Sequence, residues 1–249
     1  MLFLLKNIRR KLLTGNKVMT YLFYAIGEIF LVVVGIILAV QVDEYFSEKR
    51  DTTRVKGYLS DMIVELAKDT LETKLMIDRL NMVIKEKEWG LKRNEFDPNQ
   101  TDSLIFMMTP SVSPLRIRNQ SYSKIIDEGL ITKLRDDSLS NSIREFYKNA
   151  GDYMADIIAW ERDVSDQMEI VMFTIQNEFE FTVGEDDPRH IPHINAVRAK
   201  RVIDFAKRPQ TRNNVALDLF VKKVLRKIYL EYVEDSKKLI KHIQKSLKD

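Results

Sequence analysis

The chain of 249 residues has no cysteine, which excludes disulfide bonds, thiolate metal ligands and cysteine nucleophiles. It also lacks the signatures GxSxG, GxxxxGK, GxGxxG and HExxH, which mark several classes of hydrolase, nucleotide-binding protein and metallopeptidase. Its paired acids Asp136 and Asp137 stand at the start of a predicted helix, where capping accounts for them. We therefore predict a protein that is not an enzyme and that holds no cofactor.

Charged residues are nearly absent from residues 18–42, which read VMTYLFYAIGEIFLVVVGIILAVQV and contain only Glu28. A helix needs roughly 20 apolar residues to cross about 30 Å of hydrocarbon, so the segment is long enough. A cleaved signal peptide usually has an apolar core of only about 7 to 15 residues, followed by a small-x-small cleavage site. The sequence therefore predicts one retained transmembrane helix at residues 18–42. No other run in the chain approaches this length.

The segment before the span, residues 1–17, is basic and has no acid, whereas residues 43–60 mix both signs. Basic residues favour the cytoplasmic side of a span, so we expect a cytoplasmic N-terminus. The apolar and basic residues of this segment separate on a helix, which is typical of a segment lying on anionic lipid headgroups. Its bases supply much of the net charge of +3. The rest has no clustered basic face, so no nucleic-acid partner is expected.

Residues 43–249 have the pattern of one all-α domain. One set of residues alternates spacings of four and three, as a heptad seam does: Leu59, Ile63, Leu66, Thr70, Thr73, Ile77, Leu80 and Ile84. We expect the anchor helix to continue through this seam to about Gly90. Two further long helices are predicted: one with Asp137 or Ser138 as its N-cap that reaches about Phe181, and one from about Thr211 to Leu247. Together they indicate an up-and-down bundle of long, mostly antiparallel helices.

Shorter elements are predicted between the long helices. The segment 92–121 contains Pro98, Pro110 and Pro114 and is predicted to be a connector, with a short helix at residues 102–108. Another short helix should run from residue 122 to 128 and stop at Gly129, and residues 131–134 should add a turn. Residues 182–195 are predicted to be a loop, and residues 196–207 a helix ending before Pro209.

Glu28 is the most unusual residue of the predicted span, because a charge near the centre of a membrane helix costs about 2.5 to 3.5 kcal/mol. At 100° per residue it shares one face with small and aromatic residues, namely Tyr24, Ala25, Val32, Gly35 and Ala39. Gly35 and Ala39 form a small-xxx-small pair, which lets membrane helices approach closely. We interpret this face as a packing surface. Glu28 has three candidate roles: a structural hydrogen bond in an oligomer, binding of a second protein or a lipid, or proton transfer.

The domain contains two weaker candidate sites. Trp89, Tyr122, Tyr147 and Trp160 could line a ligand pocket, although aromatics at helical spacing are more often core residues. The acids and histidines of the predicted loop are the only metal candidates: Asp186, Asp187, His190 and His193. Pro188 and Pro192 break the helix that would align the two histidines. We therefore prefer an exposed polar loop and predict no metal.

The segment YAIGEIFLVVVGIILAVQVDEY, residues 24–45, resembles a family of uncharacterised single-pass membrane proteins of Bacteroidota. Their span has the pattern YxxGE-I-LVVxGIxIALQ, and the matching residues here are Tyr24, Gly27, Glu28, Leu31, Val32, Gly35, Ala39 and Gln41. Residues 121–147 also look like the family. The usual juxtamembrane tryptophan is absent, because Val42 to Tyr45 stand in its place. The resemblance implies a Gram-negative inner membrane and a periplasmic C-terminal domain, and it implies no activity.

The sequence thus favours a membrane-anchored envelope component that self-associates through its span and presents a periplasmic helical bundle to another envelope protein. The alternative is a sensory module whose bundle binds a small molecule. Such a module would need a separate membrane partner, because only about 17 residues precede the span.

Overall fold

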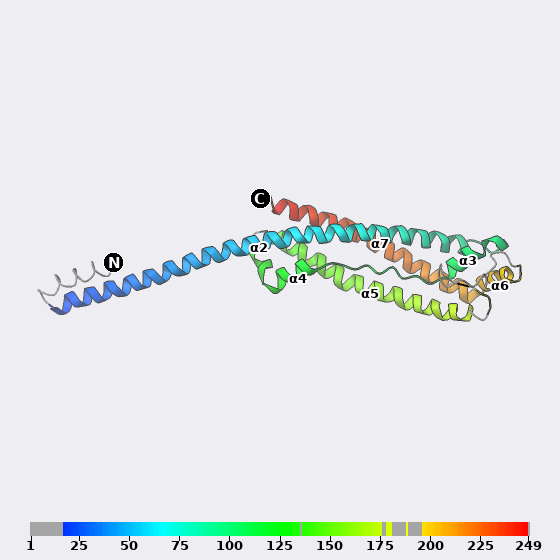
Figure 1. The fold of residues 1–249 in the computed structure, drawn as a ribbon, viewed down its shortest axis with the longest axis horizontal. Coiled ribbons are helices and arrows are strands. Elements are labelled where there is room, and N and C mark those ends of the chain that lie inside the picture. The colour runs from blue at the N-terminus through cyan, green and yellow to red at the C-terminus, as the bar shows by residue number, and fades with distance from the viewer. Residues whose placement is uncertain (1–16, 135, 176–177, 181–187, 189–195, 249) are drawn as a thin grey trace. The chain divides into compact units, whose positions relative to one another are not determined.

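The computed structural model describes residues 17–134, 136–175, 178–180, 188 and 196–248, and these are all-α, as predicted, with no strand among them. Two compact units divide the chain, Met1–Val55 and Lys56–Asp249. The elements in chain order are α2 (Lys17–Leu91), η1 (Pro98–Gln100), α3 (Thr101–Met108), α4 (Gln120–Asp127), η2 (Leu130–Lys133), α5 (Asp137–Ile175), α6 (Ala196–Ala206) and α7 (Pro209–Ser246) (Figure 1).

Helix α2 ends at Leu91, close to the predicted end at Gly90. Gly90 is buried, and a Cβ atom there would clash with the Sδ atom of Met107, which belongs to α3. The missing side chain therefore lets α3 pack against the last turn of α2. Gly129 ends α4 with a φ of 67°, a left-handed conformation that glycine adopts without strain.

Two helix boundaries differ from the prediction. The carboxylate of Asp136 accepts a hydrogen bond from the backbone N–H of Leu139 at 3.0 Å, so Asp136 is the N-cap of α5. Glu178, Phe179 and Glu180 are not helical, so the expected end of this helix at Phe181 is wrong. The physical reason is that Phe179 is buried against Phe205 of α6, which needs the chain to have left the helix by then.

The bundle consists of residues 56–91 of α2 with α5 and α7. α7 runs antiparallel to α2. Lys223, early in α7, pairs with Glu88 near the end of α2, whereas the hydroxyl of Tyr232, later in α7, donates a hydrogen bond to Asp69, earlier in α2. It also runs antiparallel to α5, but α2 and α5 run in the same direction (Figure 1). The reason is that residues 109–119 return along the bundle as an extended segment rather than as a helix. This extended segment was not predicted beyond being part of a connector.

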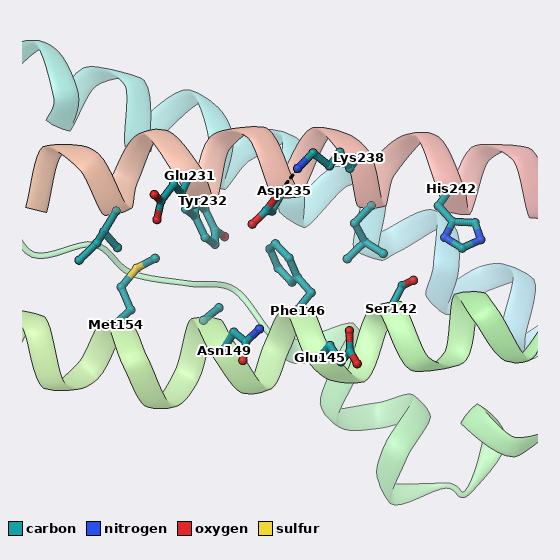
Figure 2. Close-up of a pocket in the computed structure, with 13 residues that line it drawn as sticks. Ser142, Glu145, Phe146, Asn149, Met154, Glu231, Tyr232, Asp235, Lys238 and His242 are labelled. Atoms are coloured by element: carbon teal, nitrogen blue, oxygen red, sulfur yellow. Dashed lines mark hydrogen bonds and ion pairs between the residues drawn. The ribbon is translucent and has the colours of Figure 1, made fainter.

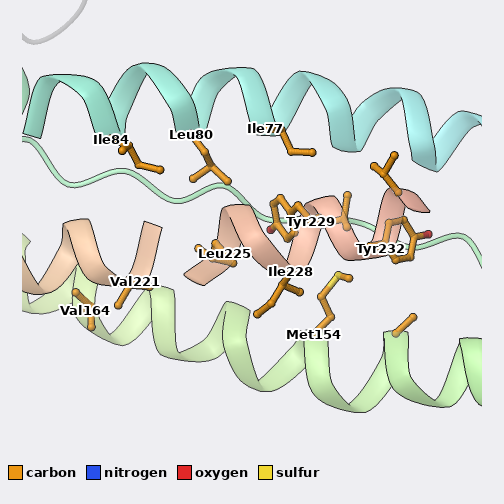
Figure 3. Packing of buried hydrophobic residues seen from close by; sticks show 13 residues of the cluster. Ile77, Leu80, Ile84, Met154, Val164, Val221, Leu225, Ile228, Tyr229 and Tyr232 are labelled. Carbon is orange, nitrogen blue, oxygen red and sulfur yellow. The ribbon is translucent and has the colours of Figure 1, made fainter. Parts of the chain in front are cut away.

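The apolar core joins all three long helices, as Figure 3 shows for side chains of α2, α5 and α7. Its buried members include Leu80, Met154, Leu225 and Tyr229. The predicted heptad seam of α2 is buried except for Ile63, which is partly exposed. This seam therefore packs inside the chain. A second cluster at the far end of the bundle combines α3, α6 and Phe179 with parts of α5 and α7.

The extended segment lacks the backbone hydrogen bonds that a helix or sheet would provide, and buried charged side chains supply them. Lys87 donates to the carbonyl of Thr109 at 3.4 Å, and Lys222 donates to the carbonyl of Ser111. Glu161 accepts the backbone N–H of Ser113 with both carboxylate oxygens at 3.1 Å. Buried polar backbone groups are costly when unpaired, so these side chains determine where the segment lies.

The charged groups also pair with one another. Lys87 lies 2.8 Å from Asp218, and Lys222 lies 2.6 Å from Glu161 and 3.4 Å from Asp218. All four side chains are essentially inaccessible to solvent. We call Lys87, Glu161, Asp218 and Lys222 the buried charge cluster. Burial lowers the pKa of Lys87, and the carboxylate of Asp218 opposes this shift.

A second set of polar contacts holds the other end of the extended segment. The carboxylate of Asp69 accepts the backbone N–H of Arg118 at 2.8 Å and its guanidinium at 2.5 Å. Glu72 accepts the same guanidinium at 2.6 Å. Further along, Glu65 accepts from Ser121. The inner face of α2 therefore contributes acids, as well as apolar residues, to the fold.

Replacing Glu161 by Gln should destabilise the bundle by about 3 kcal/mol, because it leaves two buried lysines against one carboxylate. The Gln carbonyl can still accept a hydrogen bond from the Ser113 N–H, so the loss of stability reports the removal of the negative charge alone. Denaturant unfolding of the full chain in detergent, followed by circular dichroism, measures it. Glu169→Gln, on an exposed position of the same helix, is the matched control. Adding Lys222→Met should recover part of the loss, and equal stability of Glu161→Gln and the control would contradict the prediction.

Candidate functional site

The predicted packing face lies in α2 within the unit Met1–Val55. Large apolar side chains from Tyr21 to Val42 are exposed, and none of the most apolar 18-residue window is buried. Among the described residues, one helix is long and apolar enough to cross a membrane. Glu28, Val32, Gly35 and Ala39 are all exposed, while Tyr24 and Ala25 are partly covered.

The glycines of the span have open space beside them among the described residues. A Cβ atom at Gly35 or at Gly27 would meet no described atom within 4 Å. Packing against the described part of the chain therefore gives no reason for a glycine at either position.

The two predicted domain sites fare differently. Tyr122 and Tyr147 stack with ring centroids 4.4 Å apart, and both line a cavity of about 290 Å³ beside the extended segment. Trp89 lies instead against Phe96 at the second apolar cluster, and Trp160 packs edge to face against Phe220. The structure therefore brings together only the two tyrosines of the proposed pocket.

The proposed metal residues, Asp186, Asp187, His190 and His193, lie outside the described residues. Within the described part of the chain, no group of three or more histidine, aspartate or glutamate side chains could hold a metal ion.

A larger groove lies between α5 and α7, and no pattern in the sequence predicts it. Its volume is about 640 Å³, which is in the range of small-molecule sites. Figure 2 shows α5 and α7 on its two sides, with Phe146, Met154 and Tyr232 pointing into it. Met154 of α5 and Tyr232 of α7 are 78 residues apart in sequence, which is why no local pattern revealed the groove. Its complete lining is Ser142, Glu145, Phe146, Asn149, Ala150, Met154, Ile228, Glu231, Tyr232, Asp235, Lys238, Leu239 and His242.

The rim of the groove carries more negative than positive charge. Glu145, Glu231 and Asp235 are exposed there, and Lys238 pairs with Asp235 at 2.8 Å. His242 lies 3.3 Å from Asp136 at one end. The pKa of Asp136 is lowered by the backbone N–H of Leu139 and by His242. An apolar floor with acids at the rim suits an amphipathic molecule with a positive charge.

No family model, curated protein or solved structure matches the chain. Its function is therefore inferred from two features, the exposed apolar helix with Glu28 on one face, and the groove between α5 and α7.

Three buried tyrosines of the bundle have raised pKa values: Tyr147, Tyr229 and Tyr232. Burial is the main cause, and the carboxylates of Glu65, Glu161 and Asp69, respectively, add to it. An unfolded tyrosine ionises near pH 10, whereas these tyrosines keep their protons in the fold. The folded state then binds more protons than the unfolded state above about pH 10, so stability falls as the pH rises further.

We expect Tyr147→Phe to reduce the slope of this alkaline loss. The Tyr147 hydroxyl is buried and has no hydrogen-bond partner among the described residues, so its removal should cost little at about pH 8. Tyr229→Phe should also reduce the slope, but it should cost about 1 kcal/mol at about pH 8, because the Ser113 carbonyl loses its donor at 2.6 Å. Denaturant unfolding between about pH 8 and 11 tests both. Unchanged slopes would contradict the raised pKa values.

Proposed function

We propose that this protein is a non-enzymatic, membrane-anchored component of a bacterial envelope, which self-associates through its transmembrane helix and presents its helical bundle to a partner protein. The observation that carries the proposal is the exposed face of the span, where an acid and two small residues occur together. A carboxylate in hydrocarbon is costly unless it is protonated or hydrogen-bonded, and no second span is found among the described residues. A neighbouring copy would supply a partner for it.

The proposed location is the inner membrane of a Gram-negative bacterium of the Bacteroidota. The N-terminus would be cytoplasmic and residues 43–249 periplasmic. The basic segment before the span supports this orientation, and the resemblance of residues 24–45 to the Bacteroidota family supports the membrane. The absence of cysteine leaves the domain indifferent to an oxidising compartment.

We expect Glu28→Leu and Gly35→Leu, alone and together, to lower the mass of the assembly in detergent. Gly35→Leu would separate helices that pack through small residues. Gly27→Leu is the matched control, because it makes the same change about 80° away from Gly35 on the helix and also has open space among the described residues. Light scattering coupled to size-exclusion chromatography measures the mass. A monomeric wild-type protein, or equal effects of Gly35→Leu and Gly27→Leu on the mass, would overturn the proposal that the span self-associates through this face.

The groove between α5 and α7 favours a second candidate function, a periplasmic sensory module that binds a small molecule and signals through a separate membrane partner. Its volume and apolar floor support this candidate, and its acidic rim indicates a positively charged ligand.

A ligand of the groove should raise the melting temperature of the bundle, because it binds only the folded state. A thermal-shift screen of metabolites, weighted toward amines, tests this. Asn149→Trp should abolish the shift by filling the groove, whereas Lys148→Trp, at an exposed position outside the lining, should retain it. A screen without any shift, or a shift that survives Asn149→Trp, would count against the sensory function.

A further inference from the structure

Helix α2 carries a second heptad pattern on the face that points away from the bundle core. Four large apolar side chains are exposed there, Val64 by 51%, Leu71 by 63%, Leu75 by 57% and Met82 by 63%. Exposed charged residues complete the spacing of three and four. We call the full set the outer seam: Asp61, Val64, Lys68, Leu71, Leu75, Asp78, Met82 and Lys85. All of it lies within the unit Lys56–Asp249.

The outer seam has no partner within the described chain. Its apolar residues are about half exposed or more, whereas the inner heptad seam of the same helix is buried. The side chains of Asp61, Lys68, Asp78 and Lys85 make no ion pair or hydrogen bond with any residue that the structure describes. A sustained spacing of three and four is the pattern with which one helix packs against another. The seam therefore has the features of an interface.

The order of residues along the seam indicates what covers it. Inverting the seam about Thr73 places Leu71 opposite Leu75, and Val64 opposite Met82. The same inversion places each charge opposite the other sign. Lys68 meets Asp78, and Asp61 meets Lys85. The seam is therefore complementary to itself when the second helix runs antiparallel. A two-fold axis between the helices, at the level of Thr73, would form every contact twice, as in an isologous dimer.

A parallel arrangement does not have this property. It would place Lys68 against Lys68 and Asp78 against Asp78 of the other helix, and like charges in contact are unfavourable. The apolar residues alone would allow parallel or antiparallel packing. The charges of Lys68 and Asp78 favour the antiparallel direction.

We propose that the outer seam of α2 binds the outer seam of a second copy of this chain, with the two helices antiparallel and paired about Thr73. This contact is independent of the proposed association of the spans. The outer seam lies wholly within the unit Lys56–Asp249, and the face of the span lies wholly within the unit Met1–Val55.

Cysteine crosslinking tests the proposal directly, because the natural chain has no cysteine. Val64→Cys and Met82→Cys chains, made with tags of different size and co-expressed, are oxidised with copper phenanthroline in detergent. The antiparallel seam predicts a mixed disulfide between the two chains, and about tenfold less crosslinking when either variant is expressed alone. Efficient crosslinking of Val64→Cys to itself, or no crosslinking in the mixture, would overturn the proposal.

Charge exchange then tests the direction without relying on cysteine geometry. Lys68→Glu and Asp78→Lys should each lower the mixed crosslink by about tenfold, since each places like charges together at two positions. The double variant Lys68→Glu and Asp78→Lys should restore it, because every pair is again of opposite sign. A double variant as weak as the single variants would contradict the pairing. Because both side chains are exposed, the helix content by circular dichroism should match the parent in all three.

The same crosslink in the Gly35→Leu background separates this contact from the association of the spans. It should persist there, because the outer seam contains no residue of the span. Its loss there would show that the contact depends on the span and would overturn an independent seam. Conversely, if Gly35→Leu leaves the mass of the assembly unchanged while Lys68→Glu lowers it, the association of the spans fails and the outer seam stands.

Discussion

The bundle depends on an extended segment that charged side chains hold against its helices. Ser113 and Leu115 of this segment are buried and lie in no helix or strand, so their backbone groups need partners from other parts of the chain. Lys222 and Glu161 supply a donor and an acceptor at neighbouring residues of the segment, and each is neutralised by the other at 2.6 Å. A buried charge is tolerable only when it is paired and hydrogen-bonded. Here the partner groups are the backbone of the extended segment itself.

This arrangement also sets the directions of the helices. An up-and-down bundle with short loops reverses direction at every helix. The extended segment follows α2 and precedes α5 in the sequence, and it returns along the bundle. Helices α2 and α5 therefore run in the same direction, and only α7 runs in the opposite one. The segment lies against the three helices on one side of the bundle, and a groove lies between α5 and α7 on another side.

Much of the fold could be predicted from local chemistry. The end of α2 near Gly90, the stop of α4 at Gly129 and the helices on either side of the proline-rich connector all follow from residues close together in sequence. The candidate site could be predicted only in part. Tyr122 and Tyr147 are in contact, but Trp89 and Trp160 pack elsewhere. Helical spacing predicts that a residue is buried, but it does not predict which residues of other helices it packs against. Phe146 and Tyr232, which form the groove floor, are separated by most of two helices.

The sequence by itself determined the apolar helix with Glu28, the all-α class and the inner heptad seam, because each depends on the composition and period of one continuous segment. Only the tertiary structure decided which seam of α2 is covered. The two patterns have the same spacing, and packing against α5 and α7 covers the one that begins at Leu59 while leaving Val64, Leu71, Leu75 and Met82 exposed. It also decided the position of the buried charge cluster, since Lys87, Glu161 and Lys222 are brought together by contacts between helices that no local period encodes.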